Sequence, residues 1–184
     1  MKIILSPKRL RLVYSSLAIM FGIIVLSISL ISASQAVSYE GLLATQKKLY
    51  FNEALLPDHL LYPFVAAVDR LLLIPASGNR EIELQLVYGE IRLDYAWGLL
   101  EKEEKELALV TLTKSQKYVH LAGQQLIDSS DESELLQLTI VALEKNIYQA
   151  KELIKLADAK GKELALDLNN QNQVLLSRLV DKTN

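Results

Sequence analysis

Two histidines, His59 and His120, are the first side chains to consider, because imidazole titrates near neutral pH and is a common metal ligand. They lie in different segments, and neither has a second ligand at the one-turn spacing that a helical metal site uses. Cysteine is absent, which excludes a disulfide framework, a thiol nucleophile and a cysteine-bound metal. We therefore predict no metal or cofactor site, and we interpret the histidines as a turn residue and a residue on a bundle face.

Acidic side chains are the other candidates for chemistry. One short run contains four of them: Asp128, Asp131, Glu132 and Glu134. The run lacks the alternate ligands, the central glycine and the final glutamate of a calcium-binding loop, so helix capping explains it better. Two close pairs occur elsewhere: Glu81 with Glu83, and Glu103 with Glu104. Acid–base catalysis would need two carboxylates converging in an apolar cleft, and a solvated helix face is the simpler interpretation.

Four aromatic residues gather on two neighbouring predicted helices: Tyr88, Tyr95, Trp97 and Tyr118. One interpretation is an aromatic patch that binds a peptide or glycan. The other is core packing, with the polar tips of the rings at the rim. We favour core packing.

Composition excludes several classes of function. Four of the 20 basic residues and none of the 22 acidic residues precede Leu12, so the rest of the chain carries a net charge of −6. A nucleic-acid-binding protein needs a basic face, and this balance argues against one. The glycines form no phosphate-binding loop, and no serine or threonine has a nucleophile motif around it. The sequence therefore predicts no catalytic residue and no enzyme.

The elements that would position these residues follow a long apolar segment. Residues 12–33 carry no charge and are long enough to cross a bilayer. Lysines and arginines precede them, so the positive-inside rule keeps residues 1–11 in the cytoplasm and places the rest outside. We predict a single-pass protein of the cell membrane whose anchor, residues 12–33, contacts the lipid bilayer. The alternative is a signal peptide cleaved near Ala36, which would give a secreted protein.

The rest of the chain has a helical pattern, with a juxtamembrane linker at residues 34–59 and a helical domain at residues 60–181. Four helical stretches are predicted: residues 60–74, 79–103, 105–127 and a stretch from about 131 to 180. The predicted fold class is all-α, a single N-terminal transmembrane helix followed by an antiparallel bundle of three to five helices. Two junctions stay open. The charged residues 101–106 form a turn or continue the helix, and at Gly161 the last stretch bends or folds back.

Two helical faces are predicted from periodicity. In residues 60–74, an apolar face is expected to consist of Phe64, Val68, Leu71 and Leu72, with Asp69 and Arg70 facing out. A heptad seam follows later in the chain: Leu136, Ile140, Leu143, Ile147, Ala150, Ile154 and Ala157. Such a seam either packs inside the bundle or binds a partner helix or a second copy, for which the candidates are Leu136, Ile140, Leu143, Ile147 and Ile154.

One motif resembles a known family. The run Leu56-Pro57-Asp58-His59-Leu60-Leu61-Tyr62-Pro63, followed by Arg80-Glu81-Ile82-Glu83-Leu84-Gln85-Leu86, is similar to the bacterial extracytoplasmic family known as domain of unknown function 5667. The resemblance covers about residues 56–126. It implies an all-helical exported bacterial domain and transfers no activity and no site residue. The function we expect is a membrane-tethered, non-enzymatic protein-interaction or envelope-scaffold module. The alternative is a sensory or regulatory ectodomain that acts with another membrane protein.

Overall fold

The computed structural model describes residues 19–23, 26, 56–128 and 134–183, and the chain divides into two units, Met1–Leu42 and Leu43–Asn184. In the first unit, residues 19–23 and residue 26 are helical and their side chains are exposed. Most of the predicted anchor at residues 12–33, the site of cleavage near Ala36 and most of the linker lie outside the described residues. Among the residues that are described, no helix combines the length and the apolar composition needed to cross a membrane.

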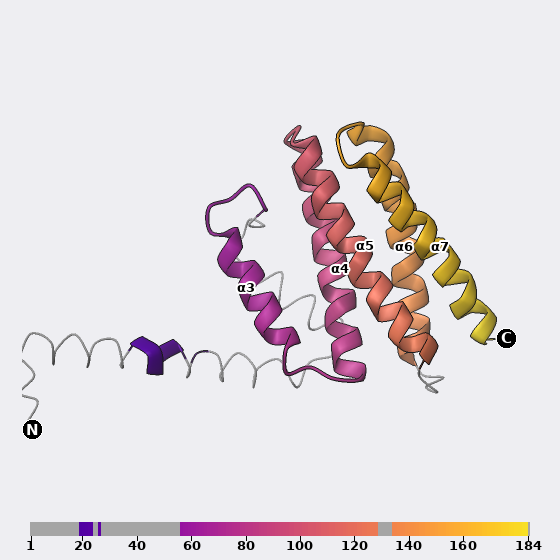
Figure 1. The fold of residues 1–184 in the computed structure, drawn as a ribbon, viewed down its shortest axis with the longest axis horizontal. Helices are drawn as coiled ribbons and strands as arrows, with labels where there is room; N and C mark the ends of the chain where they lie inside the picture. The colour runs from indigo at the N-terminus through magenta and orange to yellow at the C-terminus, as the bar shows by residue number, and fades with distance from the viewer. Residues whose placement is uncertain (1–18, 24–25, 27–55, 129–133, 184) are drawn as a thin grey trace, which may run out of the picture. The chain divides into compact units, whose positions relative to one another are not determined.

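The second unit is helical wherever it has regular structure within the described ranges, as the all-α prediction required. Its helices are α3 (Tyr62–Leu73), α4 (Asn79–Glu101), α5 (Lys105–Asp128), α6 (Glu134–Ala157) and α7 (Lys162–Thr183). Figure 1 shows α4 to α7 as long rods and α3 as a shorter one beside them. The helix boundaries agree with the predicted ones to within one or two residues at most ends.

Both open junctions are breaks. The chain turns between α4 and α5 through Lys102–Glu104, where Glu103 has a φ of 64° and the Glu104 N–H donates to the Leu99 carbonyl at 2.9 Å. A left-handed residue ends a helix because it redirects the chain and satisfies its last carbonyls. Between α6 and α7 two residues have a positive φ: Asp158, directly after α6, at 29°, and Gly161, directly before α7, at 98°. α7 therefore folds back along α6 rather than continuing it.

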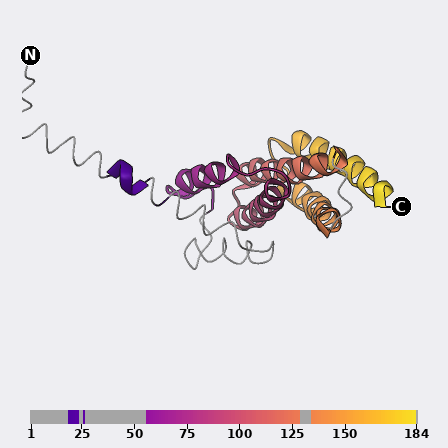
Figure 2. The ribbon, with the colours of Figure 1, turned by 90° about the horizontal axis from the view of Figure 1, so that it is seen from below.

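α5 lies at the centre of the bundle and packs against α4, α6 and α7. Figure 2, which views the helices from one end, shows α5 between α3 and α7, with α4 and α6 on the other side. Successive helices are antiparallel. The core is made of small and branched apolar side chains from four helices: Leu93, Ala96, Leu99, Ala108, Leu109, Leu112, Ala150, Leu153, Ile154, Ala157 and Ala165.

The predicted heptad seam of residues 136–157 belongs to this core. Its members lie on the side of α6 that faces the bundle, and all are buried except Ile147, which is half-buried. Of the two interpretations of the seam, the intramolecular one describes the structure. A partner helix could reach these side chains only if α6 left the bundle.

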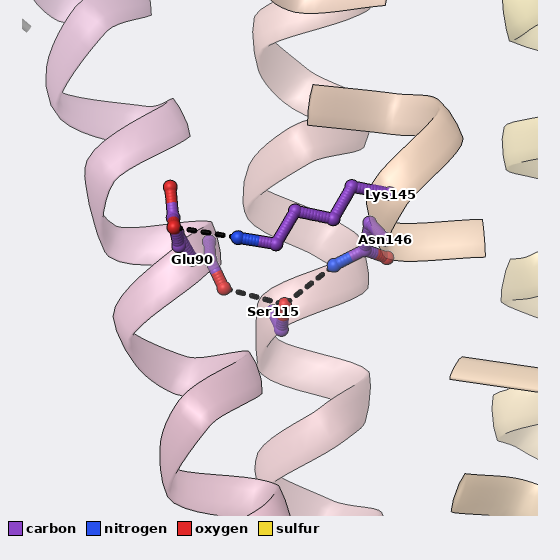
Figure 3. A network of polar contacts seen from close by, with 5 residues as sticks. Glu90, Ser115, Lys145 and Asn146 are labelled. Atoms are coloured by element: carbon purple, nitrogen blue, oxygen red, sulfur yellow. Dashed lines mark hydrogen bonds and ion pairs between the residues drawn. The ribbon is translucent and has the colours of Figure 1, made fainter. Parts of the chain in front are cut away.

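A buried polar network fixes the register of α4, α5 and α6 (Figure 3). The Ser115 hydroxyl donates to the Gly89 carbonyl at 2.6 Å and accepts from the Asn146 amide at 2.7 Å. At the rim, Lys145 Nζ pairs with Glu90 Oε1 at 2.7 Å. These directional contacts allow one alignment of the three helices, whereas apolar contacts alone would tolerate sliding.

The predicted apolar face of α3 is wrong for Phe64, Leu71 and Asp69, whereas Arg70 is exposed as predicted. Phe64 and Leu71 were expected to be buried and are exposed, whereas Asp69 was expected to face out and lies buried against α4. The cause is Arg92 of α4, which projects toward α3 and forms an ion pair with Asp69. A buried charge must be paired, so this ion pair decides which side of α3 faces the bundle. Tyr62 and Val65 pack on the same side, and Val68 and Leu72 are half-buried between the two faces.

Candidate functional site

The two histidines are far apart in the fold. His59 is exposed in the turn before α3, where its Nδ1 accepts from the Leu61 N–H at 3.2 Å. His120 lies on α5, with Nδ1 2.9 Å from the Asn172 side-chain oxygen of α7. Neither is joined by other ligands, and the part of the chain that the structure describes contains no group of three metal-ligating side chains.

The acidic candidates do not converge either. Asp128 and Glu134 are exposed at helix ends, and Asp131 and Glu132 lie outside the described residues. Glu81 accepts hydrogen bonds from Gln85 at 3.1 Å and Gln125 at 3.0 Å, and Glu83 pairs with Arg80 at 3.1 Å. Glu103 and Glu104 are exposed in the α4–α5 turn. Glu81 and Glu83 thus support helix packing and surface pairing, and none of the carboxylates within the described ranges lies with another in an apolar cleft.

The aromatic residues divide between the core and the edge of a cavity. Tyr88 and Tyr95 are buried, in agreement with the core interpretation, and Trp97 is half-buried against the apolar core. The Tyr118 ring contacts that of Tyr88 at a tilt of 57°, with ring centroids 5.8 Å apart, and Tyr118 also lines a cavity. The sequence interpretation omitted Tyr62, whose ring meets Tyr95 edge-on at 6.4 Å and lines the same cavity.

That cavity, about 180 Å³ in volume, lies among α3, α4 and α5. We call it the cationic pocket. It is lined by Tyr62, Ala66, Arg70, Arg92, Lys114, Lys117, Tyr118 and Leu121. Four of these eight side chains are basic and none is acidic, although the chain as a whole has more acidic than basic residues. The pocket therefore concentrates positive charge against the overall balance of the protein.

Arg92 lines the cationic pocket and is 3% exposed. One of its nitrogens, Nη2, pairs with Asp69, and its guanidinium lies 5.4 Å from the Tyr62 ring centroid and 5.5 Å from that of Tyr95. Burial works to lower the pKa of Arg92, but Asp69, Tyr62 and Tyr118 hold it above its usual value. The other terminal nitrogen, Nη1, is buried and has no hydrogen-bond partner among the described residues.

The remaining cations stand at the mouth of the cationic pocket. Arg70 comes from α3, and Lys114 and Lys117 come from adjacent turns of α5. The pKa of Lys114 is lowered, first because the ammonium is partly desolvated and then because Arg92 and Arg70 repel it. The three cations therefore repel one another in the folded protein, at a cost in stability.

Sequence reasoning missed this pocket because its cations are spread over three helices. The one local signal was Arg92 itself, which stands between Ile91 and Leu93 in a helix that has apolar side chains on several sides. A charge in such a position must find a partner inside the protein. Asp69, on the preceding helix, was available but was assigned to the exposed face.

A second, larger cavity of about 560 Å³ lies between α5 and α7. Its lining mixes both charge signs with amides and apolar groups: His120, Gln124, Ile127, Asp128, Gln171, Val174, Leu175 and Arg178. The two helices are joined beside it, because Lys182 Nζ donates to the Leu126 carbonyl at 2.6 Å and so caps the end of α5. Without a dominant charge, this groove indicates no particular ligand.

The exposed side of α3 is the third unusual feature, and we call it the α3 seam. Phe64, Ala67, Leu71 and Ile74 follow one another at intervals of three, four and three residues, with Leu60 one turn before. The large members are exposed to 72% (Phe64), 56% (Leu71), 77% (Ile74) and 88% (Leu60). Single exposed apolar residues are ordinary, but an apolar row along one helix marks an interaction surface.

Comparison of the chain with known family models, with curated proteins and with solved structures found no match. The resemblance to domain of unknown function 5667 therefore stays a prediction that rests on the residues of the Leu-Pro-Asp…Tyr-Pro segment and the start of α4. The cationic pocket and the α3 seam are the two features of the described structure that point to a function.

Proposed function

We propose that this protein is a membrane-tethered extracytoplasmic binding module that captures a partner protein by inserting the α3 seam into an apolar groove. The observation that carries the proposal is the exposure of the α3 seam. Amphipathic helices that bind grooves present anchors at i, i+3 and i+7, and Phe64, Ala67 and Leu71 have this spacing. The proposal assigns the protein a binding role and no catalytic one.

The position of α3 supports this role. The core is built from α4 to α7, and α3 packs against the edge of the bundle through α4. Its inner side is held by the Asp69–Arg92 ion pair and by the packing of Tyr62. These contacts fix the helix while its outer side stays open. A helix that is held in position before binding loses little conformational entropy when a partner docks.

The tether rests on the N-terminal sequence. Residues 12–33 are uncharged and follow a basic cluster, which predicts a cytoplasmic N-terminus and an extracytoplasmic bundle in a bacterial membrane. Cleavage near Ala36 would instead release the bundle, and the α3 seam would then serve a secreted protein. Carbonate extraction of membranes distinguishes the two. A tethered chain stays in the pellet at full length, and a shorter soluble product contradicts the tether.

Site-specific photo-crosslinking tests the partner. A photoreactive residue at position 64 or 71 of the full-length protein, in cells, should crosslink to one defined protein, and the same probe at position 151 on α6 should not. Lys151 is the matched control because it is also exposed on a helix surface. The substitution L71E should abolish the crosslink from position 64, because it places a charge in the apolar groove.

Two other occupants would appear as different products. Crosslinks only to lipid would mean that the α3 seam lies on the membrane surface. Crosslinks only to a second copy would make it a homodimer contact. Either product would overturn capture of a partner protein.

A further inference from the structure

We propose that the cationic pocket is a binding site for a phosphate group, carried by a small soluble molecule or by a lipid headgroup. This site is separate from the α3 seam, so the inference goes beyond the proposed function. It rests on the four basic residues that line the cavity, on the absence of an acidic residue from this lining and, within the described structure, on the unpaired Nη1 of Arg92.

Positive charge is concentrated in the cationic pocket. Arg70, Arg92, Lys114 and Lys117 approach one cavity from three helices, and Asp69, the carboxylate paired with Arg92, is not among the lining residues. Bringing like charges together is unfavourable unless an anion neutralises them. Structural needs do not explain the cluster, since Arg92 and Asp69 alone would join α3 to α4. The other three cations therefore indicate a ligand of the opposite sign.

Arg92, which lines the pocket, also carries a buried donor without a partner in the described structure. A buried polar group without a partner costs free energy, so natural proteins rarely leave one. Nη1 of Arg92 is such a group within the described structure, and its guanidinium lines the cavity. Nη1 is covered by neighbouring side chains, so a ligand oxygen would accept from it only after a small shift of these side chains, while Nη2 keeps its bond to Asp69.

The size and shape of the cavity also restrict the ligand. At about 30 Å³ for each water, a volume near 180 Å³ holds about six waters. That space suits a phosphate group with a small substituent and is smaller than the pockets that enclose drug-sized ligands. Phosphate fits better than a carboxylate, because its oxygens point in several directions and the donors here come from three helices. Arginine and lysine together are the usual ligands of phosphate.

The test is a titration of the full-length chain in a non-ionic detergent, with thermal unfolding and calorimetry as readouts and constant ionic strength set by sodium chloride. The probes are inorganic phosphate, glycerol 1-phosphate and a short-chain phosphatidylglycerol, with the matching phosphatidylcholine as a zwitterionic control. The variants are Arg70→Gln and Lys117→Gln, whose side chains are exposed and whose loss should leave the fold intact. Lys151→Gln is the matched control for loss of a surface charge.

We expect saturable binding of at least one probe, with the affinity reduced about tenfold or more in each pocket variant and unchanged in Lys151→Gln. Preference for inorganic or glycerol phosphate would identify a soluble ligand, and preference for the phosphatidylglycerol would identify a lipid headgroup. Failure of every probe to bind would overturn the proposal. Equal affinities in the wild type and both pocket variants would also overturn it. A further variant, Arg178→Gln, tests the α5–α7 groove, and loss of binding in this variant alone would contradict the proposal.

Discussion

The Asp69–Arg92 pair is the contact that most affects the architecture at the residue scale. The two side chains are only 2% (Asp69) and 3% (Arg92) exposed. Their ion pair sets the orientation of α3 and holds Arg92 in place beside the cationic pocket. Buried ion pairs contribute little net stability, but loss of one partner leaves an uncompensated charge. One pair therefore serves as a structural clamp and as a support for the pocket.

The substitution Asp69→Asn should destabilise the protein by about 3 kcal/mol, because Arg92 would stay buried without its counter-charge. Chemical denaturation of the full-length chain measures the change, with Glu144→Gln on the exposed surface of α6 as the control. Added phosphate should stabilise the variant more than the wild type, since the ligand would then supply the missing negative charge. A variant as stable as the control would contradict the clamp role.

Lys114 allows a prediction with a pH dependence. Its pKa is lowered by partial desolvation and by Arg92 and Arg70, so folding disfavours the charged form. This penalty is complete below the folded-state pKa and disappears as the pH rises above the unfolded value of 10.5. Lys114→Gln should therefore be more stable than the wild type at neutral pH, with a free energy of unfolding larger by no more than about 0.5 kcal/mol. Its melting temperature should be slightly higher. This advantage should shrink toward pH 10. The variant should also bind phosphate more weakly than the wild type at neutral pH, because it lacks one of the four cations of the pocket. Thermal scans across this pH range would reveal any opposite trend.

At the element scale, helix positions were predictable and helix faces were only partly so. Gly161 and the charged run near Glu103 marked the breaks, and the seam at Leu136–Ala157 identified the inner side of α6 because its period is strict. The prediction of the buried face of α3 was wrong because this helix has two sides of similar apolarity. Only a partner 23 residues away, Arg92, decides between them, and periodicity carries no information about such a contact. The cationic pocket was missed for the same reason, since it exists only after α3, α4 and α5 pack.

Close helix contact gives the prediction at this scale. A Cβ on Gly89 would lie 2.7 Å from Val119 Cγ1, so α4 and α5 approach more closely than any larger residue permits. Gly89→Ala should lower stability by about 1–3 kcal/mol, although alanine favours helices by about 1 kcal/mol. Val119→Ala in the same chain should restore part of the loss by removing the clashing methyl. Denaturation midpoints of the two single variants and the double variant measure the coupling, and strict additivity would argue against the contact.

At the scale of the second unit, the bundle combines a complete core with an attached helix. α4 to α7 bury the central apolar cluster and the Ser115–Asn146 network, whereas α3 adds Tyr62, Val65 and the pair with Arg92 at one edge. The two candidate surfaces therefore differ in how far they depend on α3. The α3 seam lies wholly on the added helix, and the cationic pocket needs that helix for Tyr62, Ala66 and Arg70.

A chain shortened to residues 76–184 should therefore still fold but lose both proposed functions. Arg92 would become solvent-exposed when α3 is removed, so the shortened chain keeps no unpaired buried charge at this edge. The loss of buried Tyr62 and Val65 costs about 1.5–3 kcal/mol for each side chain, which a bundle of this size can tolerate within a total of about 5–15 kcal/mol. Circular dichroism should show a helical, cooperative unfolding transition at a lower temperature. Calorimetry should show no saturable phosphate binding. If the shortened chain did not fold, the inner side of α3 would be an essential part of the core and not an attachment at its edge.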